Sequence, residues 1–486
     1  MLNSIHSVLL TIGICLLISC SRNETDVINE SPNIIIIQVD DLGWADISVQ
    51  GSTFYETPNI DRLASAGIRF TNGYASAAVC SPSRAALMTG KYPARLGITD
   101  WIRAEFQGGT IPEDLRNPTE FVGDSDKPLL TPPNPLWLEH EEITIAELLA
   151  EAGYKTAHIG KWHLGSTKWY PGTQGFDINI GGADLGEPPS YFDPYRSERV
   201  GSIPTLEPRE EGEYLTDREV WEAVHFIEEN AGTSFFLHLA HYAVHTPIQA
   251  KETLIEYYNG KPPTFQDNPV YAAMVHSVDE SVGLIIQKLK ELGLYENTFI
   301  IFTSDNGGLD RGDATRNNPF RSGKGYPYEG GIRVPFIVSW PGVVEAANVS
   351  HEPVQSIDIL PTIMDAAGIA RPDTQKLDGI SLWEHILSGG DRALGREELI
   401  WHFPHYRQGR TIPPYSIIRS GEWKLIKWWE GPEFELYNLV NDIGETQNLV
   451  SVNPKIAKGL HVRLMENLEE TGAMLPRVNP DFERPE

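Results

Sequence analysis

Residues 33–43, NIIIIQVDDLG, decide the fold. The stretch holds four consecutive isoleucines and ends in two adjacent aspartates, Asp40 and Asp41, followed by Leu42 and Gly43. A continuous β-branched run without alternation indicates a strand buried on both faces, as in a parallel sheet covered by helices. We therefore expect a buried parallel strand over residues 33–39 whose carboxyl end carries two carboxylates.

Similar strand patterns recur along the chain, and each is followed by a polar loop. They cover residues 154–159, 234–240, 298–304 and 335–340, and they precede GKWH, HYAVHTP, DNGG and PG. Helical patterns lie between them, over residues 143–152 and 271–292, and another follows the first strand at 59–66. Strands that alternate with helices predict an α/β fold with a mainly parallel sheet. Ligands of such folds gather at the carboxyl ends of the strands, where these polar clusters lie.

The pattern changes past about residue 395. Short strand patterns at 416–419, 423–427 and 435–438 precede one helical pattern at 455–471, which predicts a smaller antiparallel unit. Two earlier segments, 103–135 and 181–212, lack periodicity and read as long surface insertions. Loops of that length in a folded domain are often functional.

The composition is that of a folded, acidic protein. The 486 residues are 41% hydrophobic, and 39 Lys and Arg against 67 Asp and Glu give a net charge of −28. The apolar content excludes wholesale disorder, and 43 Gly and 35 Pro are too few for a collagen-like chain. The acidic balance argues against nucleic acid as a partner. It leaves room for an anionic substrate, because a few cations can dominate the field in a cleft.

The N-terminus reads as an export sequence. Residues 8–18 form an apolar run shorter than the roughly 18 residues that a membrane span requires. The run ends in Leu-Ile-Ser-Cys at Cys20, which resembles a bacterial lipobox, although no Lys or Arg precedes it. We expect a lipoprotein signal peptide over 1–19, a lipidated Cys20 and a polar tether over 20–31. The protein would then be anchored to a bacterial membrane, in the periplasm or at the cell surface. The alternative is an ordinary cleaved signal with an incidental cysteine.

Residues 80–91, CSPSRAALMTGK, contain the sharpest local signal. Cys80 stands in a turn, Pro82 sets the backbone, and a helix is expected beyond them. A thiolate at a helix N-terminus beside Arg84 would be activated. A buried, inert cysteine is the ordinary alternative, but it does not explain Pro and Arg at these offsets.

This stretch is similar to a family signature. C-x-P-S-R followed by L-x-T-G resembles the type I sulfatases of the alkaline-phosphatase-like superfamily, and more narrowly the exported polysaccharide sulfatases of bacteria. Four other motifs follow the family order: Asp40-Asp41, residues 153–165 (GYKT through GKWHLG), DNGG at 305–308 and GGIRVP at 330–335.

The resemblance implies an alkaline-phosphatase-like fold: a large mixed, mainly parallel sheet flanked by helices, with a smaller C-terminal antiparallel-sheet subdomain. The catalytic domain would cover residues 32–394 and an α+β subdomain residues 395–486. A sulfatase-maturation enzyme would oxidise Cys80 to formylglycine, and the protein would hydrolyse sulfate esters.

A metal site is expected from oxygen ligands at two strand ends. The candidates are Asp40, Asp41, Asp305 and Asn306. Such hard ligands suit Ca²⁺ or Mg²⁺ rather than zinc. The resemblance favours Ca²⁺, with an oxygen of the modified Cys80 facing the metal. Asp40-Asp41 alone could be a simple strand-end turn, but the second acid-amide pair favours a metal. Asp46 is expected to be solvated.

The resemblance also implies a mechanism. The hydrated aldehyde at position 80 would attack sulfur with one hydroxyl, and deprotonation of the other, by His163, would expel sulfate. Arg84 and Lys161 would hold these hydroxyls and Lys324 would contact the sulfate. His245 would protonate the leaving oxygen.

Other histidines are assigned structural positions. His241 is expected to be structural or to support the site, because the preceding strand makes a metal-binding helical pair with His245 unfavourable. His158 lies in the middle of a predicted strand and is expected to be packed in the core.

Residues outside these motifs must select the alcohol part of the substrate. The candidates, whose side chains could stack on a sugar or hydrogen-bond to it, are Trp101, Arg103, His402, His405, Arg407 and Arg410. A solvated basic loop is the alternative for each. An exported sulfatase suggests a sulfated polysaccharide, and the acidic composition weakly favours a marine algal glycan such as ulvan over an animal glycosaminoglycan.

Two other functions remain open from the sequence. One is hydrolysis of phosphate mono- or diesters on the same superfamily fold. The other is a non-catalytic glycan-binding lipoprotein, against which every expected catalytic position is filled.

Overall fold

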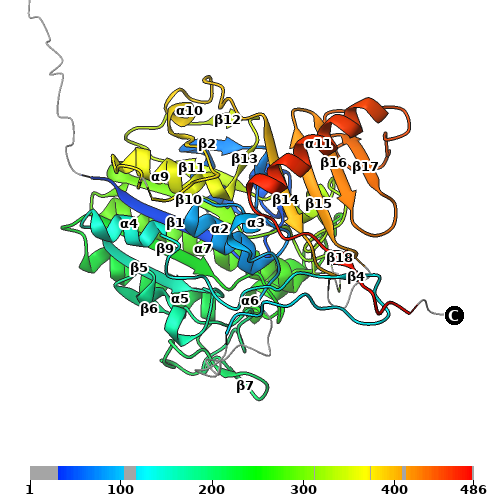
Figure 1. Ribbon diagram of the computed structural model, residues 1–486. Coiled ribbons are helices and arrows are strands. Elements are labelled where there is room, and N and C mark those ends of the chain that lie inside the picture. Colours follow the sequence, from blue (N-terminus) through cyan, green and yellow to red (C-terminus); the bar gives the residue numbers. More distant parts are fainter. Residues whose placement is uncertain are drawn as a thin grey trace, which may run out of the picture. The chain divides into compact units, whose positions relative to one another are not determined.

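The central sheet has eight strands in the order β12-β2-β11-β10-β1-β9-β5-β6, with β1 (Asn33–Val39) in its interior (Figure 1). The computed structural model describes residues 31–102, 116–310, 312, 314–372, 374–407 and 412–483. The other strands of the sheet are β2 (Gly67–Phe70), β5 (Lys155–Gly160), β6 (Ile178–Ile180), β9 (Phe235–His241), β10 (Thr298–Ser304), β11 (Phe336–Ser339) and β12 (Asn348–Ser350).

The sheet is mixed and mainly parallel, as expected. The strands β10, β1, β9, β5 and β6 run parallel to one another, and β12 runs parallel to β2. The strand β11 is antiparallel to both of its neighbours, β10 and β2. The strand expected at 335–340 therefore forms, but it runs against the others.

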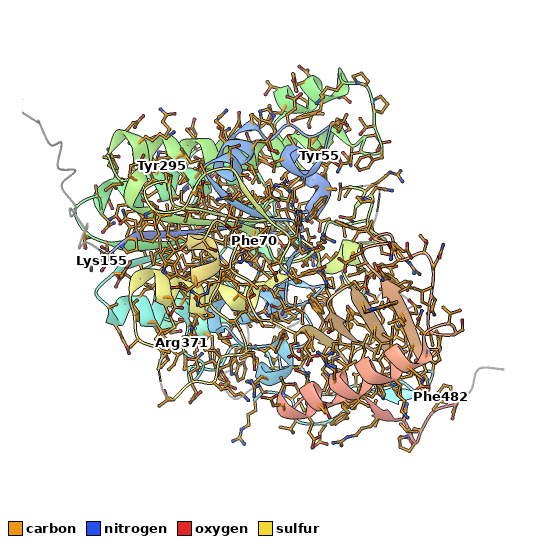
Figure 2. The ribbon with its side chains drawn as sticks, turned by 90° about the horizontal axis from the view of Figure 1, so that it is seen from above. Tyr55, Phe70, Lys155, Tyr295, Arg371 and Phe482 are labelled. Carbon is orange, nitrogen blue, oxygen red and sulfur yellow. The ribbon has the colours of Figure 1, made fainter. Side chains whose placement is uncertain are left out.

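Helices cover both faces of the sheet, which explains the isoleucine run. Ile35 and Ile37 pack with one helical layer, and Ile34 and Ile36 pack with the other. The first layer contains α1 (Pro58–Ser65), α5 (Leu215–Glu229), α6 (Glu252–Asn259) and α7 (Pro269–Glu291). The second contains α2 (Cys80–Thr89), α4 (Ile145–Glu151), α9 (Ile359–Ala367) and α10 (Trp383–Leu387). Side chains fill both layers, with Phe70 in the interior and Lys155 at the edge (Figure 2).

A second, antiparallel sheet lies in the C-terminal part. Its strands, in spatial order, are β14 (Glu398–Phe403), β15 (Tyr415–Ser420), β16 (Trp423–Trp428) and β17 (Phe434–Asn438). One face packs on α11 (Pro454–Glu470), as Figure 1 shows. The other face packs around Tyr74, Val79 and the short helix α8 (Glu329–Ile332). Residues Pro32–Glu486 form one compact unit, and the boundary at residue 395 stays a prediction.

Short elements complete the fold. Besides short 3-10 helices, they include α3 (Pro93–Leu96) and three small strand pairs: β3 (Gly73–Tyr74) with β13 (Val354–Gln355), β4 (Leu129–Leu130) with β18 (Arg477–Val478), and β7 (Arg196–Ser197) with β8 (Gly201–Ser202). Among the helices that the structure describes, none combines the length and apolar character that a membrane span requires. Cys20 and the predicted signal peptide lie outside the described residues.

Candidate active site and metal centre

The strand register brings three polar loops to one edge of the sheet. Val39 at the end of β1 pairs with Ser304 of β10 and with His241 of β9, so these strands end level. Residues 40–41 and 305–306 therefore emerge side by side. Backbone hydrogen bonds join the loops, because Asp40 N donates to Ala243 O at 2.8 Å and Asp305 N donates to Val39 O at 3.2 Å.

The four predicted metal ligands come together at this edge. Asp40, Asp41, Asp305 and Asn306 are each exposed by 1% or less. The backbone N–H of Asp41 donates to Asp305 Oδ1 at 3.2 Å, and Asn306 Nδ2 donates to Asp41 Oδ1 at 2.8 Å. So many carboxylates can be buried together only if cations compensate them.

Arg84 and Lys161 supply part of that compensation. Arg84 Nε donates to Asp305 Oδ2 at 2.8 Å, and Lys161 Nζ donates to Asp40 Oδ2 at 2.6 Å. Arg84 Nη1 also donates to the carbonyl of Lys161 at 2.7 Å, which ties the two cations together. Burial and the nearby Asp305 nevertheless raise the pKa of Asp40 well above its usual value, against the effect of Lys161. Burial thus disfavours the ionised form of Asp40 even with Lys161 beside it.

Lys324 pairs with the remaining carboxylate. Its Nζ lies 2.6 Å from Asp41 Oδ1. Burial would raise the pKa of Asp41, but Lys324 and His245 outweigh it and hold that pKa below its usual value. The loop of Lys324 is fastened beside the α2 N-terminus, because Gly325 N donates to Ala78 O at 2.8 Å.

Cys80 lies buried at the first position of α2. The turn before the helix is fixed by Ser83, whose Oγ accepts from Ala77 N at 2.9 Å and donates to Ala77 O at 3.0 Å. Burial alone would raise the pKa of the Cys80 thiol, but Lys161 and Lys324 hold it well below its usual value. This cationic surrounding favours an anion at position 80.

His163 faces Cys80 with one ring nitrogen. His163 Nε2 lies 2.9 Å from the carbonyl oxygen of Ile102, which can only accept, so Nε2 carries the proton. The neutral ring then offers Nδ1 as an acceptor. Burial and Lys161 lower the pKa of His163, and a hydrogen bond with Cys80 opposes this.

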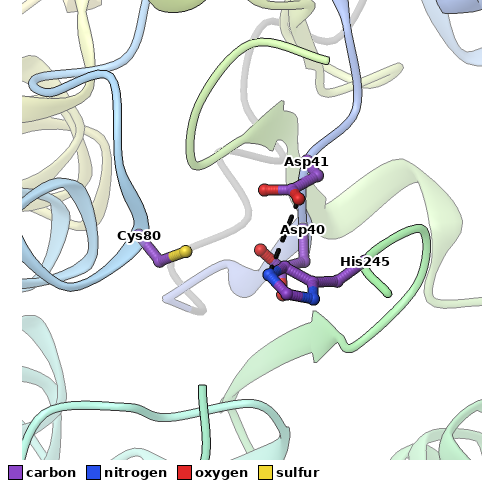
Figure 3. Close-up of side chains that lie close together, drawn as sticks. All are labelled: Asp40, Asp41, Cys80 and His245. Atoms are coloured by element: carbon purple, nitrogen blue, oxygen red, sulfur yellow. Dashed lines mark ion pairs between the residues drawn. The ribbon is translucent and has the colours of Figure 1, made fainter. Parts of the chain in front are cut away.

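His245 lies beside Asp40 and Asp41, across from Cys80 (Figure 3). His245 Nδ1 lies 2.9 Å from Thr246 O, so Nδ1 is the donor, and Nε2 lies 3.6 Å from Asp41 Oδ2. Burial and Lys324 would lower the pKa of His245, but Asp41 and Asp40 raise it overall. The two histidines thus stand in environments that shift their pKa values in opposite directions.

Unsatisfied oxygens at the strand ends fit a divalent cation. Asp40 Oδ1, Asp41 Oδ2 and Asn306 Oδ1 are buried and accept no hydrogen bond from the described residues. Buried acceptors are normally satisfied, and three together are what an oxygen-liganded ion would occupy. Ligand atoms of Asp40, Asp41, Cys80 and His245 also lie within 4.8 Å of one another (Figure 3). These residues therefore fit a metal ion.

The expected substrate-selecting residues have different fates. His405 Nε2 lies 2.8 Å from Thr99 Oγ1 and is buried, while Trp101 and Arg407 are partly buried. Arg103 and Arg410 lie outside the described residues.

The expectation that His402 faces the substrate is wrong. His402 is buried inside β14, where Nδ1 contacts Ser416 Oγ at 2.8 Å and Nε2 contacts Met474 O at 3.1 Å. The strand was not expected there, since its pattern resembled a loop between two units.

The prediction that Asp46 is solvated is also wrong, because its side chain is fully buried. It accepts hydrogen bonds from Tyr271, Thr315 and Gln266, at 2.7, 2.7 and 2.9 Å. Burial raises its pKa to about 6. Its spacing from Gly43, whose backbone N–H it also accepts, was the local signal for this role.

His241 and His158 match their predicted positions. His241 Nδ1 contacts Glu219 Oε2 at 2.6 Å and Nε2 contacts Ser281 Oγ at 2.7 Å, so neither nitrogen faces the metal ligands. His158 is buried and contacts His238 at 3.0 Å between the Nδ1 atoms. These partners lie on other elements, so no local pattern predicted them.

Comparisons with known proteins agree with the site. A family model described as Sulfatase matches residues 32–369, and one described as N-sulphoglucosamine sulphohydrolase, C-terminal, matches residues 322–473. A protein named Sulfatase from Formosa agariphila is 31% identical, over 94% of this chain and 92% of its own length. N-acetylgalactosamine-6-sulfatase from Canis lupus familiaris is 34% identical, over 87% and 77%. The crystal structure of Ps i-CgsB in complex with k-i-k-neocarrahexaose superposes with a TM-score of 0.75 at 30% identity, over 94% and 95%.

Proposed function

Because the chain belongs to the sulfatase family and is a hydrolase of carbohydrate sulfate esters, we propose that its substrate is a sulfated polysaccharide fragment and that Cys80, converted to formylglycine, carries the nucleophile. One observation carries the proposal. A buried residue of the C-x-P-S-R motif stands among cations that stabilise negative charge at its side chain. Sulfate transfer places negative charge at this point, and fixed cations in a buried site stabilise it without reorganisation.

The metal in this proposal is Ca²⁺, with Mg²⁺ as the alternative. Asp40, Asp41, Asp305 and Asn306 would hold it, supported by their unsatisfied oxygens. When bound, the ion supplies positive charge that lowers the pKa of an adjacent hydroxyl. Arg84 and Lys161 keep the ligand carboxylates in place through their ion pairs with Asp305 and Asp40.

Formylglycine at position 80 would supply a hydrated aldehyde, and therefore two hydroxyl groups, in place of one thiol. Arg84 and Lys161 would bind these hydroxyls, and Lys324 would bind the sulfate. His163 would accept the proton at Nδ1, because Ile102 O fixes the proton on Nε2. His245 would donate from Nε2 to the leaving oxygen, since Thr246 O holds Nδ1 as a donor and Asp41 stabilises the doubly protonated ring. General acid catalysis of this kind typically contributes about 10²–10⁴-fold.

The carbohydrate identity rests on the relatives and on the N-terminus. One relative is named for N-acetylgalactosamine 6-sulfate, and one similar structure was solved with a neocarrahexaose. We propose export through residues 1–19, anchoring at Cys20 and a role in degrading sulfated glycan outside the cytoplasm. Ulvan, carrageenan and chondroitin sulfate oligosaccharides are the polymers to compare.

Mass analysis of the peptide that contains Cys80 tests the chemistry. Conversion of cysteine to formylglycine removes about 18 Da. The sample should come from a host that has a sulfatase-maturation enzyme, and the same sample is assayed for sulfate release from the oligosaccharides. An active sample that carries only the unmodified thiol would overturn the formylglycine assignment. Faster turnover of phosphate than of sulfate esters would overturn the substrate class.

A further inference from the structure

We propose that Arg407 binds a second anionic group of the substrate, a sulfate ester or a carboxylate on the sugar beyond the sulfate that is cleaved. This inference rests on the proposed function and narrows its substrate class to carbohydrates with at least two negative charges close together. It comes from the contacts of the loop that follows β14.

Arg407 lies against the loop that carries Lys324. A Cβ atom placed on Gly325 would lie 2.5 Å from Arg407 Nε and 2.9 Å from its Cζ, so only glycine lets the guanidinium approach this closely. The backbone of Gly325 adopts φ +87° and donates to Ala78 O, two residues before Cys80. The guanidinium therefore lies against the backbone of the residue that follows the proposed sulfate-binding lysine, and this backbone is bonded to the residue two positions before Cys80.

The Arg407 guanidinium makes no ion pair or hydrogen bond with any residue that the structure describes, and its charge acts only on the buried hydroxyl of Tyr415 among these residues. The catalytic candidates Arg84, Lys161 and Lys324 differ, since each pairs with a strand-end carboxylate. A partly buried cation loses some of its hydration and gains nothing in return unless an anion supplies the missing interactions. An external anion is therefore the best partner for Arg407.

The loop of Arg407 is fastened to the site. His405 contacts Thr99 at 2.8 Å, and Ile102, in the same segment as Thr99, donates its backbone N–H to Ser81 Oγ at 3.0 Å. Arg407 N donates to Ile412 O at 3.2 Å. These bonds hold His405 against the segment before the first insertion, and they hold that segment against α2. Arg407 thus has a defined place relative to Cys80.

Guanidinium chemistry fits both kinds of anion. Sulfate and carboxylate each present two oxygens to the planar fork of an arginine, which a lysine cannot match. Because the chain carries a net charge of −28, a polyanionic sugar needs a local cation to bind. A second anion that Arg407 engages should strengthen binding about 10- to 100-fold, the range of charged hydrogen bonds.

The experiment measures binding in the full-length Cys80→Ala chain, which holds the sugar without turnover. Titration calorimetry compares N-acetylgalactosamine 6-sulfate with two dianionic probes, N-acetylgalactosamine 4,6-disulfate and the chondroitin 6-sulfate disaccharide, whose uronate is the other anion. Neocarrabiose with one and with two sulfates forms the second series. We expect tighter binding of a dianionic probe in at least one series by about 10- to 100-fold. The probe that shows it identifies the anion as sulfate or carboxylate.

The ratio to compare is the Kd of the monoanionic probe divided by the Kd of the dianionic probe. Arg407→Gln in the Cys80→Ala chain should reduce this ratio to about 1. Arg407→Lys should leave an intermediate ratio, because lysine keeps the charge but lacks the planar fork of the guanidinium. Arg371→Gln is the matched control, since Arg371 is exposed, pairs with Asp365 at 3.5 Å and carries the same charge. It should leave the ratio unchanged. No preference for dianionic probes in either series, or a preference that survives Arg407→Gln, would overturn the proposal. Sulfate release by the wild-type chain tests the proposed function separately, because the binding ratio needs no turnover.

Discussion

Lys424→Met should lower the free energy of unfolding by about 3–5 kcal/mol, the usual cost of removing one partner from a buried ion pair. Lys424 on β16 is fully buried, and its Nζ lies 3.0 Å from Glu329 Oε1 and 2.8 Å from Glu445 Oε1. Both carboxylates are also fully buried. We expect the upper half of the range, because one ammonium serves two carboxylates. Glu329 keeps Arg333 and Tyr74 as partners, so the loss of the ammonium leaves Glu445 as the less compensated carboxylate.

The loss of unfolding free energy caused by Lys424→Met should increase as the pH rises. Burial raises the pKa of Glu445 from 4.5 to about 7, although Lys424 opposes the rise. The folded chain thus keeps a proton that the unfolded chain releases above pH 4.5, so this group makes stability fall as pH rises towards 7. Without Lys424 the pKa of Glu445 rises further. The difference between variant and wild type should therefore be larger at about pH 8 than at about pH 6.

Urea unfolding, followed by tryptophan fluorescence at both pH values, measures the free energy of unfolding of the variant and of the wild type. Lys427→Met is the matched control: it lies on the same strand, is half-exposed and packs on Trp429 rather than on a carboxylate. It should cost about 1 kcal/mol or less. Adding Glu445→Gln to Lys424→Met should recover part of the loss. The reasoning is refuted if Lys424→Met is no less stable than Lys427→Met, or if its deficit is the same at both pH values.

Three other changes test the site itself. Cys80→Ala should abolish sulfate release, measured by ion chromatography, while the melting temperature stays close to that of the wild type; residual turnover near the native level would contradict the nucleophile. His245→Gln should lower kcat/KM on a sugar sulfate by about 10²–10⁴-fold and on an aryl sulfate by less, because a phenolate leaves without a proton; equal losses would argue against a general acid. Removal of divalent ions with EGTA should lower the melting temperature, and Ca²⁺ at 100 times its Kd should raise the free energy of unfolding again by about 2.7 kcal/mol. A melting temperature that is the same with and without EGTA would contradict the metal site.

The correct sequence predictions share one property, which is that their signal is local. The isoleucine run predicted β1 because burial on both faces leaves no alternation, and the aspartates that follow had to lie at a strand end. The helix after Cys80 followed from the residues around it. Because β1 and β10 end at the same level, Asp305 lies beside Asp40, and no further sequence pattern was needed to predict this.

The incorrect predictions concern residues whose environment comes from distant elements. The sequence around His402 resembles a loop, but in the fold its ring contacts Ser416 of β15 and the carbonyl of Met474. Asp46 resembled a solvated acid, but Tyr271 and Thr315 approach it from more than 220 positions away. A polar residue in such a pattern is consistent with either solvent or a buried hydrogen bond, and only the fold decides between them.

The sequence alone determined which chemical groups this protein has and the order of the strands' polar ends, because periodicity and motif spacing act over a few residues. The tertiary structure alone decided which cations are compensated. Lys324 and Lys161 are neutralised by strand-end aspartates, whereas Arg407 stands beside the same loop without such a partner. Ion pairing depends on distances of a few ångströms between residues far apart in the chain, and only the tertiary packing of their strands and loops fixes these distances.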